Sequence, residues 1–252
     1  NKFGIPWGNV REICQRASKL PGINLVGLDL HIGSQITKLE PFEEAFTRVA
    51  GLVKLLREDG HNITRLDLGG GLGISYECND LPPLPSDYAK MVKRVTEHLG
   101  CRIILEPGRF LVGNAGILVS TVVYIKDGEE RKFLIVDAAM NDLIRPSMYD
   151  AYHEIVPVLE SNEDILLYDI VGPVCETGDS FASNRPITSM KTGDLLAIRS
   201  VGAYGAVMSS TYNTRKLIPE VLVKDDKFAV VRPRPTYEEI INLDHIAPWL
   251  SE

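Results

Sequence analysis

The stretch ITRLDLGGGLG, residues 63–73, decides the fold class. Its first half is a short apolar run of the kind that forms a buried strand, and its second half is a glycine cluster. Glycine permits positive φ and lets backbone amides come close to a bound anion. The stretch therefore predicts a buried strand that runs into a phosphate-binding turn, and a flexible turn without a ligand is the alternative.

Helix and strand patterns alternate on both sides of this stretch. Apolar runs occur at 23–33 and 101–109, and amphipathic helical patterns occupy 8–20, 41–60 and 87–100. Such alternation is typical of a parallel sheet covered by helices. Three strand–helix units are too few for a closed barrel, which takes eight over typically ~250 residues. We expect either a small open sheet or a barrel from which about five units are absent on the N-terminal side.

The second half of the chain has a different pattern. Residues 116–138 form two β-rich runs around Asp127-Gly128, which is a hairpin signal. Further short strands follow, with turn residues between them. Only 202–210 and 236–246 have the pattern of a helix. This half therefore predicts a mostly antiparallel β domain.

These two patterns predict two domains. Residues 1–114 hold about three units of a (β/α) barrel, and residues 115–252 hold the β domain. The predicted fold class is therefore α/β plus β. In parallel α/β folds the C-terminal ends of the strands are where binding sites are assembled.

Composition limits the functions open to this chain. It has 252 residues, a net charge of −7, 44% apolar and 24% charged residues, and no cluster of basic residues. These values indicate a globular protein and exclude a general nucleic-acid surface. No apolar run is long enough to cross a membrane.

The four cysteines are widely spaced, and no pair has the CxxC spacing of a metal site. They stand at Cys14, Cys78, Cys101 and Cys175, without a histidine at ligand spacing. We expect no metal site and no disulfide framework. This cysteine usage fits a reducing cytoplasm.

Two further motifs follow the other apolar runs. HIGSQ begins at His31 and carries a hydroxyl at Ser34, and EPGR places Glu106 three residues before Arg109. Each has an ordinary alternative, a hydrogen-bonded core histidine for the first and a surface ion pair for the second. Together with the glycine cluster, they suit a phosphorylated cofactor whose ring nitrogen needs a negative partner.

The stretch VCETGD, residues 174–179, sets a thiol beside a carboxylate in a rigid loop. Gly172-Pro173 precedes Cys175 and Glu176, and Gly178 follows them. Glycine and proline mark turns far more often than active sites. The loop alone therefore reads as a turn between two strands, and a catalytic loop is the alternative.

Six motifs together resemble the diaminopimelate decarboxylases. They are HIGSQ, LDLGGGLG, EPGRFLVGNAG, NDLIRPSMY, CETGD and GAYG, in the order and approximate spacing of that family. The family consists of alanine-racemase-like enzymes that depend on pyridoxal 5'-phosphate and combine a barrel with a β domain. The resemblance implies a partial (β/α)8 barrel followed by a C-terminal β domain, and pyridoxal phosphate as cofactor.

The resemblance also implies a cofactor site in the first half. His31 resembles the imidazole that stacks on the pyridine ring and serves in catalysis. Ser34, Gly70, Gly71 and Gly108 resemble the residues that hold the phosphate.

Five further residues resemble cofactor and substrate ligands. Glu106 matches the carboxylate paired with the pyridine nitrogen, and an ionised partner there keeps the ring a good electron sink. Arg109, Arg145 and Tyr149 match positions that bind the distal carboxylate of the substrate, which suits the planar fork of arginine. Arg109 also lies beside the cofactor, and Tyr204 matches a tyrosine that reaches both cofactor and substrate.

By the same resemblance, the Cys-Glu loop crosses a dimer interface. Cys175 would protonate the carbanion after CO₂ leaves, and Glu176 would bind the distal ammonium of the substrate. The resemblance thus implies a homodimer in which both side chains reach the site of the partner subunit. With it, the catalytic reading of the loop becomes the favoured one.

One essential family residue has no match, the lysine that forms the Schiff base with the cofactor. Lys2, Lys38 and Lys54 lie in segments predicted to be loop or helix, and we assign none of them to this role. We expect the chain to be the C-terminal part of a decarboxylase, inactive by itself.

The resemblance implies that the intact enzyme converts meso-2,6-diaminopimelate to L-lysine and CO₂, the last step of lysine biosynthesis. CETGD and the pattern from Arg145 to Tyr149 favour a substrate with a second carboxylate. Two alternatives stay open. One is a related decarboxylase for ornithine or arginine, and the other is a non-catalytic fragment that binds pyridoxal phosphate or dimerises.

Overall fold

The computed structural model describes residues 2–77 and 81–250. Cys78 lies outside the described residues. The chain divides into two compact units, Asn1–Asn114 (unit 1) and Ala115–Glu252 (unit 2), and each is described by itself. Within the described ranges, no helix has the length and hydropathy needed to cross a membrane.

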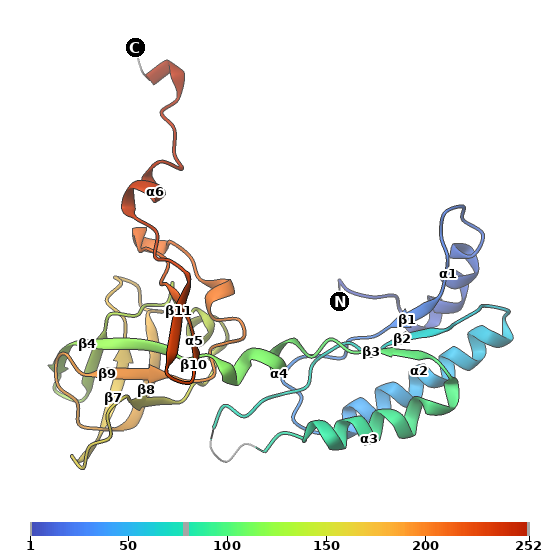
Figure 1. The fold of residues 1–252 in the computed structure, drawn as a ribbon, viewed down its shortest axis with the longest axis horizontal. Coiled ribbons are helices and arrows are strands. Elements are labelled where there is room, and N and C mark those ends of the chain that lie inside the picture. The colour runs from blue at the N-terminus through green and yellow to red at the C-terminus, as the bar shows by residue number, and fades with distance from the viewer. Residues whose placement is uncertain (1, 78–80, 251–252) are drawn as a thin grey trace. The chain divides into compact units, whose positions relative to one another are not determined.

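Unit 1 is built around a small parallel sheet with strand order β1-β2-β3. Gly27 pairs with Arg65, and Arg65 pairs with Arg102, so the three strands run side by side in one direction. Figure 1 shows α2 and α3 lying together along this sheet. The predicted α/β alternation is confirmed. The elements are η1 Trp7–Asn9, α1 Val10–Ala17, β1 Gly27–Asp29, α2 Glu40–Glu58, β2 Arg65–Asp67, α3 Pro85–Thr96, η2 Glu97–Leu99, β3 Arg102–Ile104, α4 Gly108–Val112 and η3 Gly113–Ala115.

An aromatic cluster joins α2 and α3 in the core of unit 1. Phe42 and Phe46, one helical turn apart on α2, are fully buried. Tyr88 of α3 meets the ring of Phe42 edge-on, with centroids 5.3 Å apart. Complete burial of an aromatic or aliphatic side chain contributes roughly 1.5–3 kcal/mol. This packing fixes the helices that support the sheet.

Unit 2 contains a six-stranded sheet in the order β6-β9-β4-β5-β7-β8. Only β5 and β7 pair in parallel among these strands, and the predicted hairpin of residues 116–138 is confirmed by the antiparallel pairing of β4 with β5. The edge strands β6 and β8 approach each other, so the sheet forms a nearly closed mixed β-barrel. The elements are β4 Leu118–Asp127, β5 Lys132–Val136, α5 Arg145–Tyr149, β6 Ile155–Pro157, β7 Ile165–Val171, β8 Ser180–Thr188 and β9 Leu195–Ile198.

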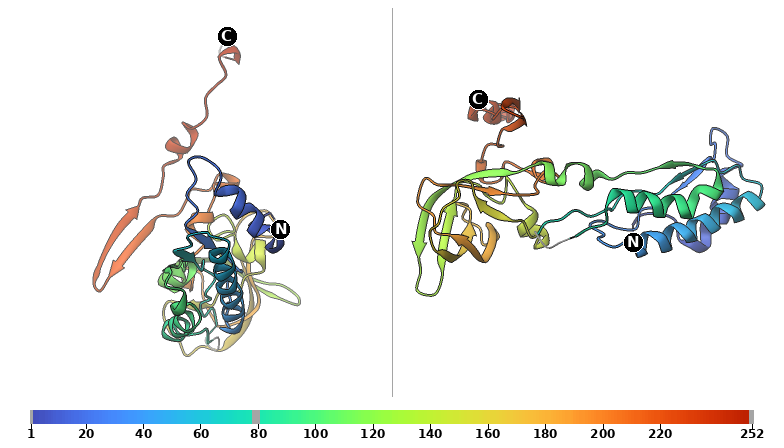
Figure 2. Two further views of the ribbon diagram at one scale, coloured as in Figure 1. Left: turned by 90° about the vertical axis from the view of Figure 1, so that its right-hand side faces the viewer. Right: turned by 60° about the horizontal axis from the view of Figure 1, so that its bottom comes forward.

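A separate two-stranded hairpin and a short helix follow the barrel of unit 2. Figure 2 shows the hairpin standing apart from the six-stranded sheet. The helix begins with a capping box, in which the Thr236 hydroxyl accepts the N–H of Glu239 at 3.1 Å and the Glu239 carboxylate accepts the N–H of Thr236 at 2.7 Å. The elements are η4 Ala206–Met208, η5 Tyr212–Thr214, β10 Glu220–Lys224, β11 Lys227–Arg232, α6 Tyr237–Ile241 and η6 Pro248–Leu250.

Several predicted elements are shorter in the structure. The apolar run 23–33 contains only the three-residue strand β1, because the chain turns out of the sheet before His31. The helix predicted at 202–210 is wrong apart from one 3₁₀ turn, since Tyr204 adopts a φ of 60° that no right-handed helix accepts. The helix predicted at 236–246 spans only α6.

Candidate functional site

Three polar motifs meet at the carboxyl ends of the strands in unit 1. His31 follows β1, the glycine cluster follows β2, and Glu106 follows β3. Backbone hydrogen bonds continue beyond the strands, from the N–H of Leu68 to the carbonyl of Ile104 at 3.0 Å and from Glu106 to Gly69 at 2.8 Å. Because the strands are parallel and adjacent, the three motifs lie at one edge of the sheet.

The glycine cluster is packed directly against the neighbouring strand ends. A Cβ on Gly70 would lie 2.2 Å from the carbonyl oxygen of Glu106, and one on Gly71 would lie 2.4 Å from that of Gly33. Gly71 also has a φ of 101°, which side-chain-bearing residues rarely adopt. Only glycine fits at these two positions, so the close approach of the three strand ends depends on them.

His31 is oriented by a backbone donor of this cluster. The N–H of Gly70 donates to Nδ1 of His31 at 3.3 Å. A neutral imidazole that accepts at Nδ1 carries its proton on Nε2. The ring is exposed, and this contact sets its tautomer and its direction.

Arg109 connects two other parts of the same edge. It lies on α4, which begins at Gly108, and its guanidinium donates to Oγ of Ser34 at 3.1 Å and to the hydroxyl of Tyr76. The N–H of Gly108 donates to the carbonyl of Glu106 at 2.8 Å, which shapes the turn between the carboxylate and the helix. Ser34 and Arg109 therefore form one hydrogen-bonded group.

The Cys-Glu loop of unit 2 is the turn between β7 and β8. Cys175 is a free thiol, and both Cys175 and Glu176 are exposed. One Glu176 carboxylate oxygen accepts the hydroxyl of Tyr212 at 3.4 Å, and the other faces the N–H of Gly178 at 3.5 Å. These are long contacts, so the carboxylate keeps most of its capacity to accept hydrogen bonds from a cation.

Helix α5 lies against this turn and carries two predicted substrate ligands. The hydroxyl of Ser147 donates to the carbonyl of Gly178, which joins the helix to the loop. Arg145 is buried, with 8% of its surface exposed, and Tyr149 at the end of the helix is exposed. Unit 2 therefore brings Arg145 and Tyr149 together with the Cys-Glu turn.

Two buried residues near these groups were assigned no role from the sequence; His153 lies in none of the quoted motifs, and Asp179 is the last residue of CETGD. His153 is fully buried and its Nε2 lies 3.0 Å from a guanidinium nitrogen of Arg145. Asp179 is 4% exposed, and burial raises the pKa of its carboxyl. A hydrophilic residue that becomes buried through contacts between distant segments cannot be recognised from local spacing.

Tyr204 lies on a tight turn rather than on a helix. Its φ is 60°, and the ring is partly exposed. A Cβ on the following Gly205 would lie 2.3 Å from the carbonyl oxygen of Val201, so this turn requires glycine. The GAYG motif thus presents a tyrosine side chain from a strained position.

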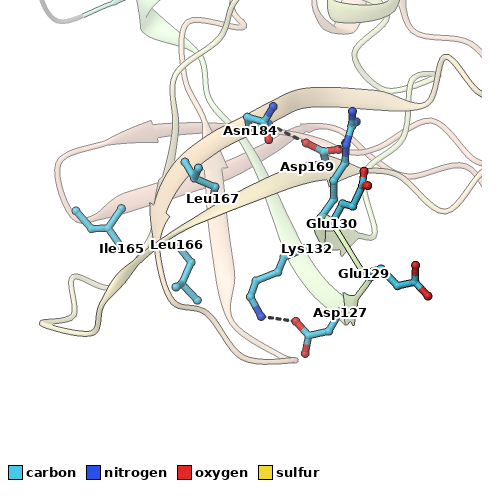
Figure 3. Close-up of a pocket in the computed structure, with 11 residues that line it drawn as sticks. Asp127, Glu129, Glu130, Lys132, Ile165, Leu166, Leu167, Asp169 and Asn184 are labelled. Carbon is cyan, nitrogen blue, oxygen red and sulfur yellow. Dashed lines mark hydrogen bonds and ion pairs between the residues drawn. The ribbon is translucent and has the colours of Figure 1, made fainter.

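The groove in Figure 3 is a different feature of unit 2. It has a volume of about 420 Å³ and lies between the β4–β5 turn and strand β7. Its polar lining is largely paired, because Lys132 contacts Asp127 and the N–H of Asn184 donates to Asp169 at 2.7 Å. None of the sequence-predicted site residues lines it. Among the described residues, no group of His, Cys, Asp and Glu is arranged to hold a metal ion.

Comparison with known proteins gives a consistent family. The family model described as pyridoxal-dependent decarboxylase, C-terminal sheet domain, matches residues 24–202. Diaminopimelate decarboxylase of Zymomonas mobilis is 48% identical over 251 residues, covering 99% of this chain and 59% of that protein. The corresponding protein of Aquifex aeolicus is 46% identical and covers 96% of this chain. The chain thus spans about 59% of the length of the curated relatives it matches.

Solved structures agree with this result. Diaminopimelate decarboxylase from M. jannaschii, in complex with L-lysine, has a TM-score of 0.95 at 37% identity and covers 99% of this chain and 59% of that one. The Helicobacter pylori enzyme, also complexed with L-lysine, has a TM-score of 0.91 at 40% identity over 96% of this chain and 60% of that one. The chain therefore belongs to the pyridoxal-dependent decarboxylases and is a homologue of diaminopimelate decarboxylase.

Proposed function

We propose that this chain supplies the cofactor- and substrate-binding residues of an enzyme that decarboxylates meso-2,6-diaminopimelate to L-lysine and CO₂. One observation carries the proposal. A histidine, a glycine turn, a carboxylate and an arginine gather at one edge of a parallel sheet, in a chain of the pyridoxal-dependent decarboxylase family.

The residues at this edge fit pyridoxal 5'-phosphate. The glycine turn leaves no room for side chains at Gly70 and Gly71, and Ser34 and Arg109 add a hydroxyl and a guanidinium suited to the phosphate. The exposed carboxylate of Glu106 suits the pyridine nitrogen. When bound, the cofactor supplies an electron sink for the bond that breaks at the α-carbon of the substrate.

The residues at this edge have different tasks in the proposal. Glu106 keeps the proton on the ring nitrogen, and His31, fixed by the N–H of Gly70, offers its ring face to the pyridine. Gly108, whose N–H is bonded to the carbonyl of Glu106, places the start of α4 near the phosphate. Tyr204 belongs to unit 2, and the family resemblance assigns it to the cofactor and the substrate.

The residues of unit 2 bind the distal end of the substrate in this proposal. Arg145 and Tyr149 bind the distal carboxylate, together with Arg109, and Glu176 binds the distal ammonium. Cys175 gives its proton to the α-carbon after CO₂ has left, as a positioned thiol can act as a general acid. The exposure of Cys175 and Glu176 supports their reaching a neighbouring molecule, and we propose a homodimer in which they enter the partner's site.

The proposed cofactor edge does not include a lysine. Lys38 precedes α2 and Lys54 lies on it, away from the strand ends in sequence. We therefore propose that the lysine bonded to the cofactor is outside these 252 residues. By the assembled enzyme we mean this chain together with whatever supplies that lysine, and we expect no turnover from the 252 residues alone.

A substrate comparison tests this function. We expect the assembled enzyme to prefer meso-diaminopimelate to ornithine and to arginine by at least about a hundredfold in kcat/KM, because a site built for a second carboxylate rejects substrates that lack it. Arg145→Lys keeps the charge but loses the two-pronged contact, so it should reduce this preference. Equal or higher kcat/KM for ornithine or arginine would assign the chain to the related decarboxylases, and cofactor binding without any turnover would make it a non-catalytic protein.

A further inference from the structure

The turn that carries Cys175 and Glu176 is closed by a single buried carboxylate, that of Asp179. One carboxylate oxygen, Oδ2, accepts the N–H of Val174 at 2.7 Å, and the other, Oδ1, accepts the N–H of Met140 at 2.6 Å. Val174 immediately precedes Cys175, and Met140 lies on the segment that leads into α5. One side chain thus holds two backbone segments that are far apart in sequence.

The backbone of Asp179 closes the same turn a second time. Its N–H donates to the carbonyl of Glu176 at 3.0 Å, and its carbonyl accepts the N–H of Gly172 at 3.0 Å. Gly172 also makes room for the carboxylate, because a Cβ there would lie 2.3 and 2.4 Å from the two carboxylate oxygens. Gly172 and Asp179 therefore form a matched pair at the base of the turn.

A charged group at this position is not explained by packing. Burial, with a smaller effect from the charge of Asp142, raises the pKa of Asp179, so keeping the carboxylate ionised costs free energy. The N–H groups of Val174 and Met140 and the charge of Arg215 offset part of that cost. An apolar side chain would avoid burying a charge, but it would leave the N–H groups of Val174 and Met140 without this acceptor. What the carboxylate adds is a pair of directed contacts to the two segments.

We propose that Asp179 is a positioning residue for Cys175 and Glu176. It fixes the thiol and the glutamate carboxylate at the tip of the β7–β8 turn and ties that tip to the segment before Arg145. The chemical meaning of this role rests on the function proposed above. The fixing of the turn itself can be measured without any turnover.

Four variants of the chain separate this role from general destabilisation. Asp179→Asn keeps the shape but replaces one accepting oxygen with a donor, and Gly172→Ala pushes the carboxylate aside without changing it. Asp169→Asn is the matched control, because Asp169 is 5% exposed on the same strand pair, accepts a backbone N–H from Asn184 and pairs with Arg131, all outside residues 172–179 (Figure 3). Gly178→Ala controls for the added methyl, since a Cβ there would lie 3.6 Å from its nearest neighbour.

Hydrogen exchange and thiol alkylation give the two readouts. In Asp179→Asn and Gly172→Ala, we expect peptides covering 172–179 to exchange roughly tenfold faster or more, because a charge-assisted hydrogen bond is lost. We also expect iodoacetamide to modify Cys175 several-fold faster, since the turn is freed. Asp169→Asn should speed exchange only around Asn184, and Gly178→Ala should leave the turn as in the wild type.

Equal behaviour of Asp179→Asn and Asp169→Asn in both readouts would overturn the proposal. If Asp179→Asn does not fold, Gly172→Ala decides, and wild-type exchange at 172–179 in that variant also overturns it. These outcomes are independent of the reaction, so an absence of decarboxylase activity would count against the proposed function alone.

Steady-state kinetics of the assembled enzyme distinguish a positioning residue from a purely structural one, because only a positioning residue acts on KM through Glu176. Asp179→Asn should lower kcat and raise KM for diaminopimelate. In a Glu176→Gln background, it should raise KM no further, because the two changes then act through one contact. A full additional rise in that background would contradict a role through Glu176.

Discussion

His153 has a role that follows from its two hydrogen-bond partners. A guanidinium only donates hydrogen bonds, so Nε2 of His153 must accept from Arg145 at 3.0 Å. Nδ1 then carries the proton and donates to the carbonyl of Arg199 at 2.9 Å. The buried ring is therefore a neutral imidazole of one tautomer that orients Arg145.

This geometry predicts different effects for two substitutions of His153. His153→Leu should raise KM for diaminopimelate by about tenfold, because the hydrogen bond that orients the proposed carboxylate ligand is lost. His153→Gln should have a KM close to that of the wild type, since its side-chain amide can accept a hydrogen bond from the guanidinium of Arg145 and donate one to the carbonyl of Arg199. Steady-state kinetics with a urea unfolding curve for each variant check this, and an unchanged KM in His153→Leu would show that Arg145 is oriented by other contacts.

Single residues divide into those that the sequence could predict and those it could not. The glycine cluster, His31 and Glu106 were readable because each follows an apolar run, and parallel strands end at one edge. His153 and Asp179 were missed because their partners lie in distant segments, such as Arg199 for His153 and Met140 for Asp179. The CETGD motif contains Asp179 but does not show that its carboxylate is buried or which backbone N–H groups it accepts, and no motif contains His153.

At the scale of elements, α2 and α3 are held against the sheet of unit 1 by rings that exclude water. Tyr88 is buried among Phe42 and Phe46, and burial raises its pKa to about 12 from an ordinary value of 10.0. A phenol whose pKa is higher in the folded chain keeps its proton there after the unfolded chain has released it. Folding stability therefore falls as pH rises from 10.0 toward 12.

Tyr88→Phe should reduce this alkaline loss of stability. We expect the wild type to lose more unfolding free energy than Tyr88→Phe between pH about 9 and about 11, because only the wild type carries the buried phenol at position 88. Urea unfolding of unit 1, followed by hydrogen exchange of α3 peptides at both pH values, measures the difference. Tyr124→Phe is the control, since Tyr124 is 58% exposed. The same alkaline loss in the wild type and Tyr88→Phe would contradict the assignment.

The helices were easier to predict than the strands for a physical reason. The apolar face of α2 repeats with helical spacing, and its predicted members Phe46, Val49, Leu52, Val53 and Leu56 are all buried. The strands have only three residues each in unit 1, because glycines and polar residues take the chain out of the sheet where the site forms. The GAYG segment failed as a helix because Tyr204 has positive φ, which a helical pattern does not reveal.

At the scale of the whole molecule, the α/β and β parts predicted from the change in pattern are confirmed, together with the pyridoxal-dependent family. The roles of single site residues stay predictions. These roles depend on where the substrate and the cofactor bind, which a sequence pattern does not specify. We propose that unit 1 binds the cofactor and that Cys175 of unit 2 donates the proton to the decarboxylated substrate.

The most direct test is release of labelled CO₂ and formation of lysine from carboxyl-labelled meso-diaminopimelate by the assembled, cofactor-loaded enzyme. Cys175→Ala should lower turnover by about 10²–10⁴-fold, which is the usual contribution of a positioned proton donor. Cys101→Ala is the matched control, since its half-buried thiol contacts Arg57 in unit 1 at 3.2 Å. Wild-type turnover in Cys175→Ala would show that Cys175 is not the proton donor.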